Sequence, residues 1–132
     1  QVTAKEGNWI ILIKAATNVL KGDNFVFVYP ELLKNKFIVR RGEVITSEIL
    51  KKKDLDFENI NLKINTLLKK TSDKIMSRGS IVKEITTKGD FIKKIGDSIQ
   101  INQKNKYLLE VISLKDSKTA EQIIVELNVT GL

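Results

Sequence analysis

Hydrophobic and polar residues alternate along much of this chain, in runs short enough for β-strands. The alternation is clearest in Gln122–Val129, where every second residue from Ile123 onward is apolar. Such a pattern buries one face of a strand and leaves the other in water. The strand predicted at Lys106–Ser113 is equally clear. The other predicted strands are continuous apolar runs or short runs of strand-forming residues: Trp9–Lys14, Phe25–Tyr29, Lys36–Arg40, Ile81–Ile85 and Ser98–Ile101.

Five of the seven glycines share one local pattern that predicts tight turns. Each is followed by an acidic or small polar residue and then by strand-forming apolar residues. Glycine reaches the positive φ angles that tight turns need, and Asp or Ser can bond to the turn backbone. Such turns between short strands are typical of a compact β fold. The predicted turn residues are Gly22, Gly42, Gly79, Gly89 and Gly96.

Two segments carry helical rather than strand periodicity. Thr46 is suited to cap a short helical turn over residues 47–52, because its hydroxyl can accept a backbone N–H. Further along, apolar residues at i, i+4, i+7 and i+8 from Ile60 fall on one helical face. Since residues 57–64 also alternate as a strand would, we expect a helix over Asn65–Met76 and extended chain before it. The whole pattern predicts a mainly β fold with one or two short helices.

Composition and length fit one globular unit without covalent or metal cross-links. The chain has 132 residues, of which 42% are hydrophobic and 30% charged, and it contains neither His nor Cys. The lack of these two residue types excludes zinc fingers, Ser-His-Asp and Cys-His catalysis, c-type haem and thiol redox centres. The 16 acidic residues are scattered, so we expect no metal site, no cofactor and no catalytic residue.

Basic residues outnumber acidic ones by 23 to 16, which gives a net charge of +7. This excess favours an anionic partner without choosing between nucleic acid, lipid head groups and an acidic protein. Nucleic-acid surfaces place exposed aromatic residues beside cationic grooves. Most Phe residues here lie in apolar strand patterns, so no nucleic-acid partner is expected. The longest apolar runs have five residues, far below the roughly 20 that cross a bilayer, so no integral membrane segment is expected.

One short motif, Ser80-x-x-Lys83, has the spacing found in Ser/Lys acyl-transfer enzymes. That chemistry needs the Ser at the start of a helix, so that the Lys lies one turn along beside it. The intervening Ile81 and Val82 favour a strand, which would place the two side chains on opposite faces. The motif therefore does not predict an enzyme.

The segment 36–50 resembles the opening of an SAF domain. In that family a strand leads into a Gly-Glu-Val-Ile-Thr turn, as at Gly42–Thr46, and then into a short helix. The later pieces follow in the same order: Gly79–Ile85 resembles the second strand, Lys88–Ile92 its following turn, and Ile95–Ile101 the segment that enters the final hairpins.

The resemblance implies a β-clip over residues 36–132, in which short strands fold over one another in paired hairpins. Residues 1–35 would form a reduced N-terminal β element. The tail from Tyr107 to Val125 resembles the C-terminal half of the FlgA family of flagellar P-ring assembly chaperones. That likeness implies a non-catalytic protein of the periplasm, which binds the flagellar P-ring protein transiently and assists its assembly around the rod. The first residue, Gln1, is compatible with a leader that has been removed or trimmed.

Three other functions are open on the same residues. A pilus-assembly SAF protein would share the segment Gly42–Leu50, so only neighbouring genes would separate it from a flagellar one. A carbohydrate-binding SAF module would bring polar and aromatic residues to one pocket, and no such cluster is evident in the sequence. A basic nucleic-acid binder would lose affinity steeply as salt rises.

An apolar edge near the N terminus supplies most of the candidate partner-binding residues, because an extended client segment can add to a sheet edge. Two arginines follow this segment and would attract an acidic client. The alternative for the aromatic residues is burial in the core. The candidates are Trp9, Phe25, Phe27, Tyr29, Arg40 and Arg41.

Overall fold

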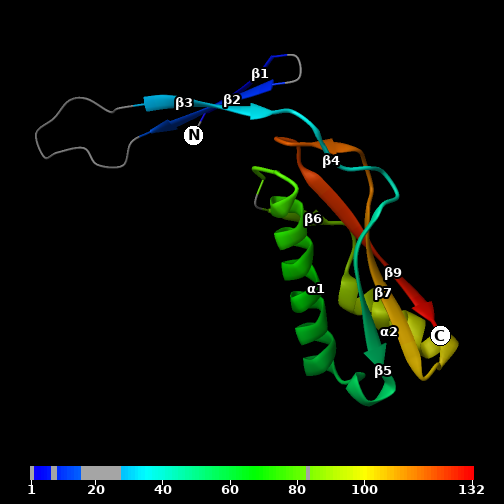
Figure 1. The fold of residues 1–132 in the computed structure, drawn as a ribbon. Coiled ribbons are helices and arrows are strands. Elements are labelled where there is room, and N and C mark those ends of the chain that lie inside the picture. Colours follow the sequence, from blue (N-terminus) through cyan, green and yellow to red (C-terminus); the bar gives the residue numbers. More distant parts are fainter. Residues whose placement is uncertain (1, 7–8, 16–27, 83) are drawn as a thin grey trace, which may run out of the picture. The chain divides into compact units, whose positions relative to one another are not determined.

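The computed structural model describes residues 2–6, 9–15, 28–82 and 84–132. The chain divides into two compact units, Gln1–Lys36 and Phe37–Leu132 (Figure 1). The second unit holds both α-helices of the described chain and its larger sheet.

The N-terminal unit contains an antiparallel three-stranded sheet of order β1-β2-β3. Its strands are β1 (Val2–Glu6), β2 (Trp9–Ala15) and β3 (Val28–Lys34). The strand expected at Trp9–Lys14 is confirmed by β2. Pro30 lies in β3, an edge strand among the described strands of this sheet, where a proline is tolerated although it has no N–H to donate. Of the strand expected at Phe25–Tyr29, only the last two residues are described, and both belong to β3.

The C-terminal unit is built on a mixed four-stranded sheet of order β5-β7-β9-β6. β7 runs antiparallel to both of its neighbours, whereas β6 runs parallel to β9. A separate antiparallel pair joins β4 to β8. The strands are β4 (Phe37–Val39), β5 (Val44–Lys51), β6 (Ile85–Thr87), β7 (Lys106–Ser113), β8 (Ser117–Lys118) and β9 (Ile123–Gly131).

Helical segments complete this unit: η1, a turn of 3-10 helix (Lys52–Asp54), α1 (Phe57–Ser77) and α2 (Phe91–Asn102). α2 begins at a capped end, because the Asp90 carboxylate accepts the N–H groups of Ile92 and Lys93 at 3.0 and 3.2 Å. The buried residues of α1 recur at helical spacing, so that one stripe of the helix faces the sheet. They are Ile60, Ile64, Leu67, Thr71 and Ile75.

Both helices cover the same face of the sheet, with α1 packed on β5 and α2 on β9 (Figure 1). That face supplies the buried strand residues of the core: Leu50, Tyr107, Leu109, Val111, Ile123, Val125 and Leu127. Neither of these helices covers the opposite face of the sheet. Its apolar residues are partly exposed: Ile49, Leu108, Ile112 and Ile124.

The fold is therefore a strand-rich mixture of sheets and two helices, as the alternation of short strands predicts. The strands expected at Lys36–Arg40, Lys106–Ser113 and Gln122–Val129 are confirmed by β4, β7 and β9. The helix over Asn65–Met76 is confirmed within α1, which is longer than expected. The β-clip implied by the resemblance is not established by this topology and stays a prediction.

The short helix expected over residues 47–52, with Thr46 as its cap, is wrong, because residues 44–51 form β5. The segment is extended because it pairs with β7, and its successive side chains point alternately to the two faces of the sheet. Thr46 Oγ1 hydrogen-bonds to Thr71 Oγ1 on α1, and Leu50 is fully buried.

Residues 57–64, expected to be extended, are the first turns of α1. Ile60 and Ile64 are buried one helical turn apart, whereas Leu62 between them is exposed. Burial at i and i+4 therefore outweighs the strand-like alternation of the three residues.

The turn expected at Gly96 is wrong, since this residue lies inside α2. The strand expected at Ser98–Ile101 is wrong for the same reason, because these residues belong to the end of that helix. The helix forms because Asp90 caps it and because Phe91 and Ile95, one turn apart, are buried against the core.

The strand expected at Ile81–Ile85 is displaced toward β6, which begins at Ile85. β6 reaches the sheet by pairing Ile85 with Ile123 and Thr87 with Val125 of β9. Ile81 instead donates its N–H to the carbonyl of Thr119, before β9 begins. Only the end of the predicted strand therefore joins the sheet.

Gly42, Gly79 and Gly89 adopt positive φ angles of 83°, 102° and 81°. This conformation favours glycine over all other residues. Gly79 follows α1 and Gly89 precedes α2, so two of these turns border helices. Gly22 lies outside the described residues.

Candidate functional site

Three segments of the C-terminal unit converge at the start of β5: the β4–β5 turn, the β7–β8 turn and the end of α1. Backbone groups hold the two turns together, since Gly42 N–H donates to Ser113 O at 2.8 Å and Ser113 N–H donates to Glu43 O at 3.0 Å. The Asp116 carboxylate accepts the N–H of Arg41 at 2.7 Å. We call the aromatic and basic surface residues of these turns and of the adjoining strands β4 and β8 the cationic corner: Phe37, Arg40, Arg41, Lys115 and Lys118.

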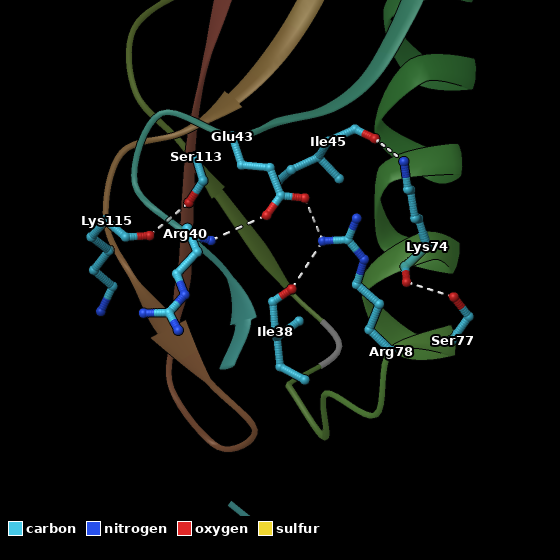
Figure 2. Close-up of polar contacts among 9 residues, drawn as sticks. All are labelled: Ile38, Arg40, Glu43, Ile45, Lys74, Ser77, Arg78, Ser113 and Lys115. Carbon is cyan, nitrogen blue, oxygen red and sulfur yellow. Dashed lines mark hydrogen bonds and ion pairs between the residues drawn. The ribbon is translucent and has the colours of Figure 1, made fainter. Parts of the chain in front are cut away.

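Glu43 anchors the β4–β5 turn (Figure 2). Its Oε1 accepts the backbone N–H of Arg40 at 3.2 Å, and its Oε2 accepts Arg78 Nη1 at 2.6 Å. The same nitrogen of Arg78 donates to Ile38 O at 2.9 Å. One arginine at the end of α1 therefore holds both sides of the turn.

Further hydrogen bonds fix the surrounding backbone (Figure 2). Lys74 Nζ donates to Ile45 O at 2.7 Å, and Ser77 Oγ donates to Lys74 O at 2.7 Å. In the neighbouring turn, Ser113 Oγ donates to Lys115 O at 2.7 Å. The main chain that carries the corner is thus tied both to α1 and within itself.

Electrostatics keep Glu43 ionised. Partial burial by itself would raise the pKa of Glu43, but hydrogen bonds from Arg78 and from the Arg40 N–H outweigh it, aided by the charges of Arg78 and Lys74. The pKa of Glu43 therefore lies below its ordinary value. At neutral pH this carboxylate is charged and committed to internal contacts.

Phe37 and two cations form the exposed centre of the corner. Phe37 is 42% exposed and pairs with Lys118 across the β4–β8 ladder. The Arg40 guanidinium lies over the ring, 3.4 Å from its centroid, and the Lys118 ammonium lies 5.0 Å from the same point. Both are within the roughly 6 Å range of cation–π attraction. The ring therefore orients two positive charges.

The basic side chains of the corner outnumber the carboxylates that are not already paired with an arginine, Asp116 and Glu121. Among the described residues, none of the four basic side chains of the corner forms an ion pair. Three carboxylates contact this part of the chain: Glu43 is paired with Arg78, and Asp116 and Glu121 accept the backbone N–H groups of Arg41 and Lys118. The corner is therefore a net positive surface that can receive an anionic group.

The structure separates two of the candidate partner-binding residues along the N-terminal sheet. Trp9 pairs with Lys34 at one end of the β2–β3 ladder, and Tyr29 pairs with Lys14 near the other end. The two aromatic residues therefore do not lie opposite one another in the ladder.

The other candidates fall into two groups. Phe25 and Phe27 lie outside the described residues, whereas Arg40 and Arg41 are adjacent in the cationic corner. Sequence reasoning missed the aromatic centre of that corner, because Phe37 sits in an apolar run that indicates core packing. Phe37 and Arg40 are only three residues apart, so their contact could have been expected from the sequence. The approach of Lys118 to the ring could not, because it depends on pairing between distant strands.

A shallow hollow of about 240 Å³ lies between α1 and the start of α2. It is lined mainly by apolar side chains, including Ile64, Leu68 and Ile92. Its aromatic residue, Phe91, is buried, and its carboxylate, Asp90, already caps α2. The hollow therefore presents neither an exposed ring for sugar stacking nor an acid–base pair.

The Ser80-x-x-Lys83 motif gains no support, although Lys83 itself lies outside the described residues. Ser80 follows α1 instead of starting a helix, and its Oγ accepts the N–H of Val82 at 3.2 Å. The described part of the chain also contains no group of three or more acidic side chains that could hold a metal ion. None of its helices combines the length and apolar character required to cross a membrane.

Comparison of the chain with known proteins found no matching family model, curated protein or solved structure. Two segments that carry the SAF resemblance also differ here from their expected form, since residues 46–50 are a strand and residues 95–101 are helical. The geometry of the corner is thus the main guide to function.

Proposed function

We propose that this protein is a non-catalytic binding protein whose cationic corner docks an acidic segment of a protein partner. The proposal rests on one contrast at the corner: its carboxylates make internal contacts, whereas its basic side chains form no ion pair within the described chain. The three nearby carboxylates, Glu43, Asp116 and Glu121, all accept internal hydrogen bonds. The basic side chains have no carboxylate partner among the described residues: Arg40, Arg41, Lys115 and Lys118.

An acidic segment would meet groups that are already in place. Phe37 holds the Arg40 guanidinium over its ring, and Asp116 fixes the backbone of Arg41. Arginine presents a planar fork of donors that can bind a carboxylate through two parallel hydrogen bonds. Because the Arg40 guanidinium is oriented before the partner arrives, less of its side-chain entropy is lost on binding.

The surroundings of Phe37 favour a protein partner over nucleic acid. A nucleic-acid platform needs an open aromatic face on which a base can stack. The Arg40 guanidinium lies over the Phe37 ring, and the Lys118 ammonium lies over it at a longer distance. A carboxylate can bind these cations where they are, whereas a stacking base would have to displace them.

The particular partner implied by the likeness of the tail to the FlgA family is the flagellar P-ring protein in the periplasm. In that form of the proposal, the protein binds the ring subunit transiently and assists its assembly around the rod. Crosslinking in cells followed by co-purification tests this partner. Clean absence of the ring subunit from the crosslinked material would rule out this partner.

Fluorescence anisotropy with the full chain tests the docking surface. The probe is a labelled peptide of alternating Glu and Ser, and a labelled DNA duplex serves for comparison. We expect the peptide to bind at low salt and to weaken as salt rises, since exposed charges are screened over about 8–10 Å at physiological ionic strength. The double variant Arg40→Glu/Arg41→Glu should bind the peptide about ten-fold more weakly.

The matched control is Lys93→Glu/Lys94→Glu, which changes the net charge equally at an exposed site on α2. This variant should retain most of the affinity for the peptide. Equal losses in the two variants would mean that binding follows net charge and not the corner. Tighter binding of the duplex than of the peptide, lost in the arginine variant, would assign the corner to nucleic acid.

A further inference from the structure

A second cationic surface lies at the other end of β5, away from the cationic corner. β5 ends at Lys51, which pairs with Lys106 at the start of β7, and η1 follows directly. Figure 1 shows the β5–α1 connection and the α2–β7 turn at the same end of the C-terminal unit. We call its basic residues the lysine tip: Lys51, Lys52, Lys53, Lys104 and Lys106.

Hydrogen bonds fix the backbone of the lysine tip. Lys52 N–H donates to Asn105 O at 2.9 Å, which joins η1 to the α2–β7 turn. Lys104 N–H donates at 2.8 Å to the hydroxyl of Tyr107, a fully buried residue. The stem of Lys104 also lies so close to Gly131 that a Cβ there would be 2.6 Å from Lys104 Cγ. The backbone of the lysine tip is therefore held in place by the rest of the fold.

The charges of the tip point to an anionic ligand. All five lysines are exposed, and among the described residues none of them forms an ion pair. The nearest carboxylates in the sequence face α1, since Asp54 lines a hollow there with Lys63 and Asp56 accepts Asn59 Nδ2. Glu58 lies in the first turn of α1. Lys51 and Lys106 are directly opposite in the ladder, an arrangement that is unfavourable without a counter-charge.

Two large apolar side chains protrude at the same end. Ile101, in the last turn of α2, is 80% exposed, and Phe57, the first residue of α1, is 66% exposed. Phe57 follows Lys51–Lys53 in the chain, and Ile101 precedes Lys104. Apolar side chains at the same end as a group of lysines match the boundary between lipid head groups and acyl chains, although the chain neighbours of Phe57, Asp56 and Glu58, are acidic.

We propose that the lysine tip, together with Phe57 and Ile101, docks this protein on the surface of an anionic phospholipid bilayer. The ammonium groups contact the lipid phosphates, and the two apolar side chains enter the boundary below them. β5 runs from the corner to the tip, so the two surfaces are roughly 25 Å apart at about 3.3 Å per residue. A partner held at the corner can therefore be bound while the tip rests on the membrane.

Co-sedimentation of the full chain with vesicles tests the proposal. Vesicles of phosphatidylglycerol mixed with phosphatidylcholine should bind the protein, and vesicles of phosphatidylcholine alone should not. The triple variant Lys51→Gln/Lys52→Gln/Lys53→Gln should bind the anionic vesicles about a hundred-fold more weakly, because each lysine near such a surface contributes roughly five-fold. Its matched control replaces three exposed lysines elsewhere: Lys88→Gln, Lys93→Gln and Lys94→Gln.

A second pair of variants distinguishes the contribution of the inserted apolar side chains to vesicle binding from that of the lysine charges. Phe57→Ser/Ile101→Ser should weaken vesicle binding at every salt concentration, whereas Met76→Ser, at the far end of α1, should not. Circular dichroism of each variant verifies that the fold is intact. The proposal would be overturned if the protein bound neutral vesicles as tightly as anionic ones. It would also be overturned if the tip variant and its control variant, each with three lysines replaced, lost the same vesicle affinity. Binding of duplex DNA through the tip lysines without vesicle binding would overturn it in favour of nucleic acid.

Discussion

The guanidinium of Arg78 lies 2.6 Å from the carboxylate of Glu43, and this ion pair joins the end of α1 to the β4–β5 turn. Because Glu43 is held by Arg78, it does not neutralise Arg40, whose guanidinium lies instead over Phe37. The internal ion pair therefore has two effects. It stabilises the turn, and it leaves the basic side chains of the corner without Glu43 as a counter-charge.

Replacing Arg78 by Met should destabilise the C-terminal unit. The variant loses the charged hydrogen bonds to Glu43 and to the carbonyl of Ile38, while the methionine retains most of the aliphatic packing. We expect the free energy of unfolding, measured in urea, to fall by about 1–2 kcal/mol. Lys69→Met, at an exposed position on α1, is the control and should change it by less than about 0.5 kcal/mol. Equal stability of the two variants would contradict the anchoring role of Arg78.

Stability should decline in acid because two glutamates have lowered pKa values. The pKa of Glu48 is lowered chiefly by the hydrogen bond from Lys70, against the effect of burial, and that of Glu43 is lowered by its contacts with Arg78. Their folded pKa values lie below those of the unfolded chain, so the unfolded state binds more protons in acid. This contribution is present above about pH 4.3, the ordinary glutamate value, and is lost as the pH falls through the folded values.

Urea unfolding measured across the acid range tests this pH dependence. The double variant Glu43→Gln/Glu48→Gln should be less stable than the original chain at neutral pH. Its free energy of unfolding should also fall less steeply with acid, because the two groups no longer titrate. An identical slope in both proteins would show that other carboxylates cause the acid loss.

Alanine at two of the glycines should have opposite effects. Gly42 has a φ of +83°, which an alanine adopts only with strain, so Gly42→Ala should lower stability by about 1–2 kcal/mol. Gly96 lies inside α2, and a Cβ there would meet nothing within 4 Å, so Gly96→Ala should raise stability by about 0.5–1 kcal/mol. Thermal unfolding gives the sign directly. Destabilisation by Gly96→Ala would support a turn at this position and contradict the helix.

The first turns of α1 can be tested with proline at an exposed site. Leu62 is 64% exposed, so Leu62→Ser should have little effect on packing. Leu62→Pro should cost about 3 kcal/mol or more if residues 57–64 are helical, since proline removes a hydrogen bond and clashes with the preceding turn. Similar stability of the two variants would show that this segment is extended.

Local patterns predict the fold where neighbouring residues decide the structure. β7 and β9 follow from alternation, and most of α1 follows from its helical stripe. β5 does not, because its extended form depends on pairing with β7, far along the chain. Thr46 resembles a helix cap but lies in that strand. α2 contains Gly96, a weak helix former, and forms because Asp90 caps it and its apolar face is buried.

The candidate site was predictable only in part. Arg40 and Arg41 form a cationic pair that is visible in the sequence, and both lie in the corner. Phe37 joins Lys118 only through the β4–β8 register. The anchor between Glu43 and Arg78 spans 35 residues and has no local signature.

Amide chemical shifts recorded by NMR while the Glu–Ser peptide is titrated into the full chain test the docking claim most directly. Saturable shifts confined to residues 37–43 and 115–118, and absent in Arg40→Glu/Arg41→Glu, are the predicted result. Shifts spread evenly over exposed lysines throughout the chain, or none at all at low salt, would contradict a docking site at the cationic corner.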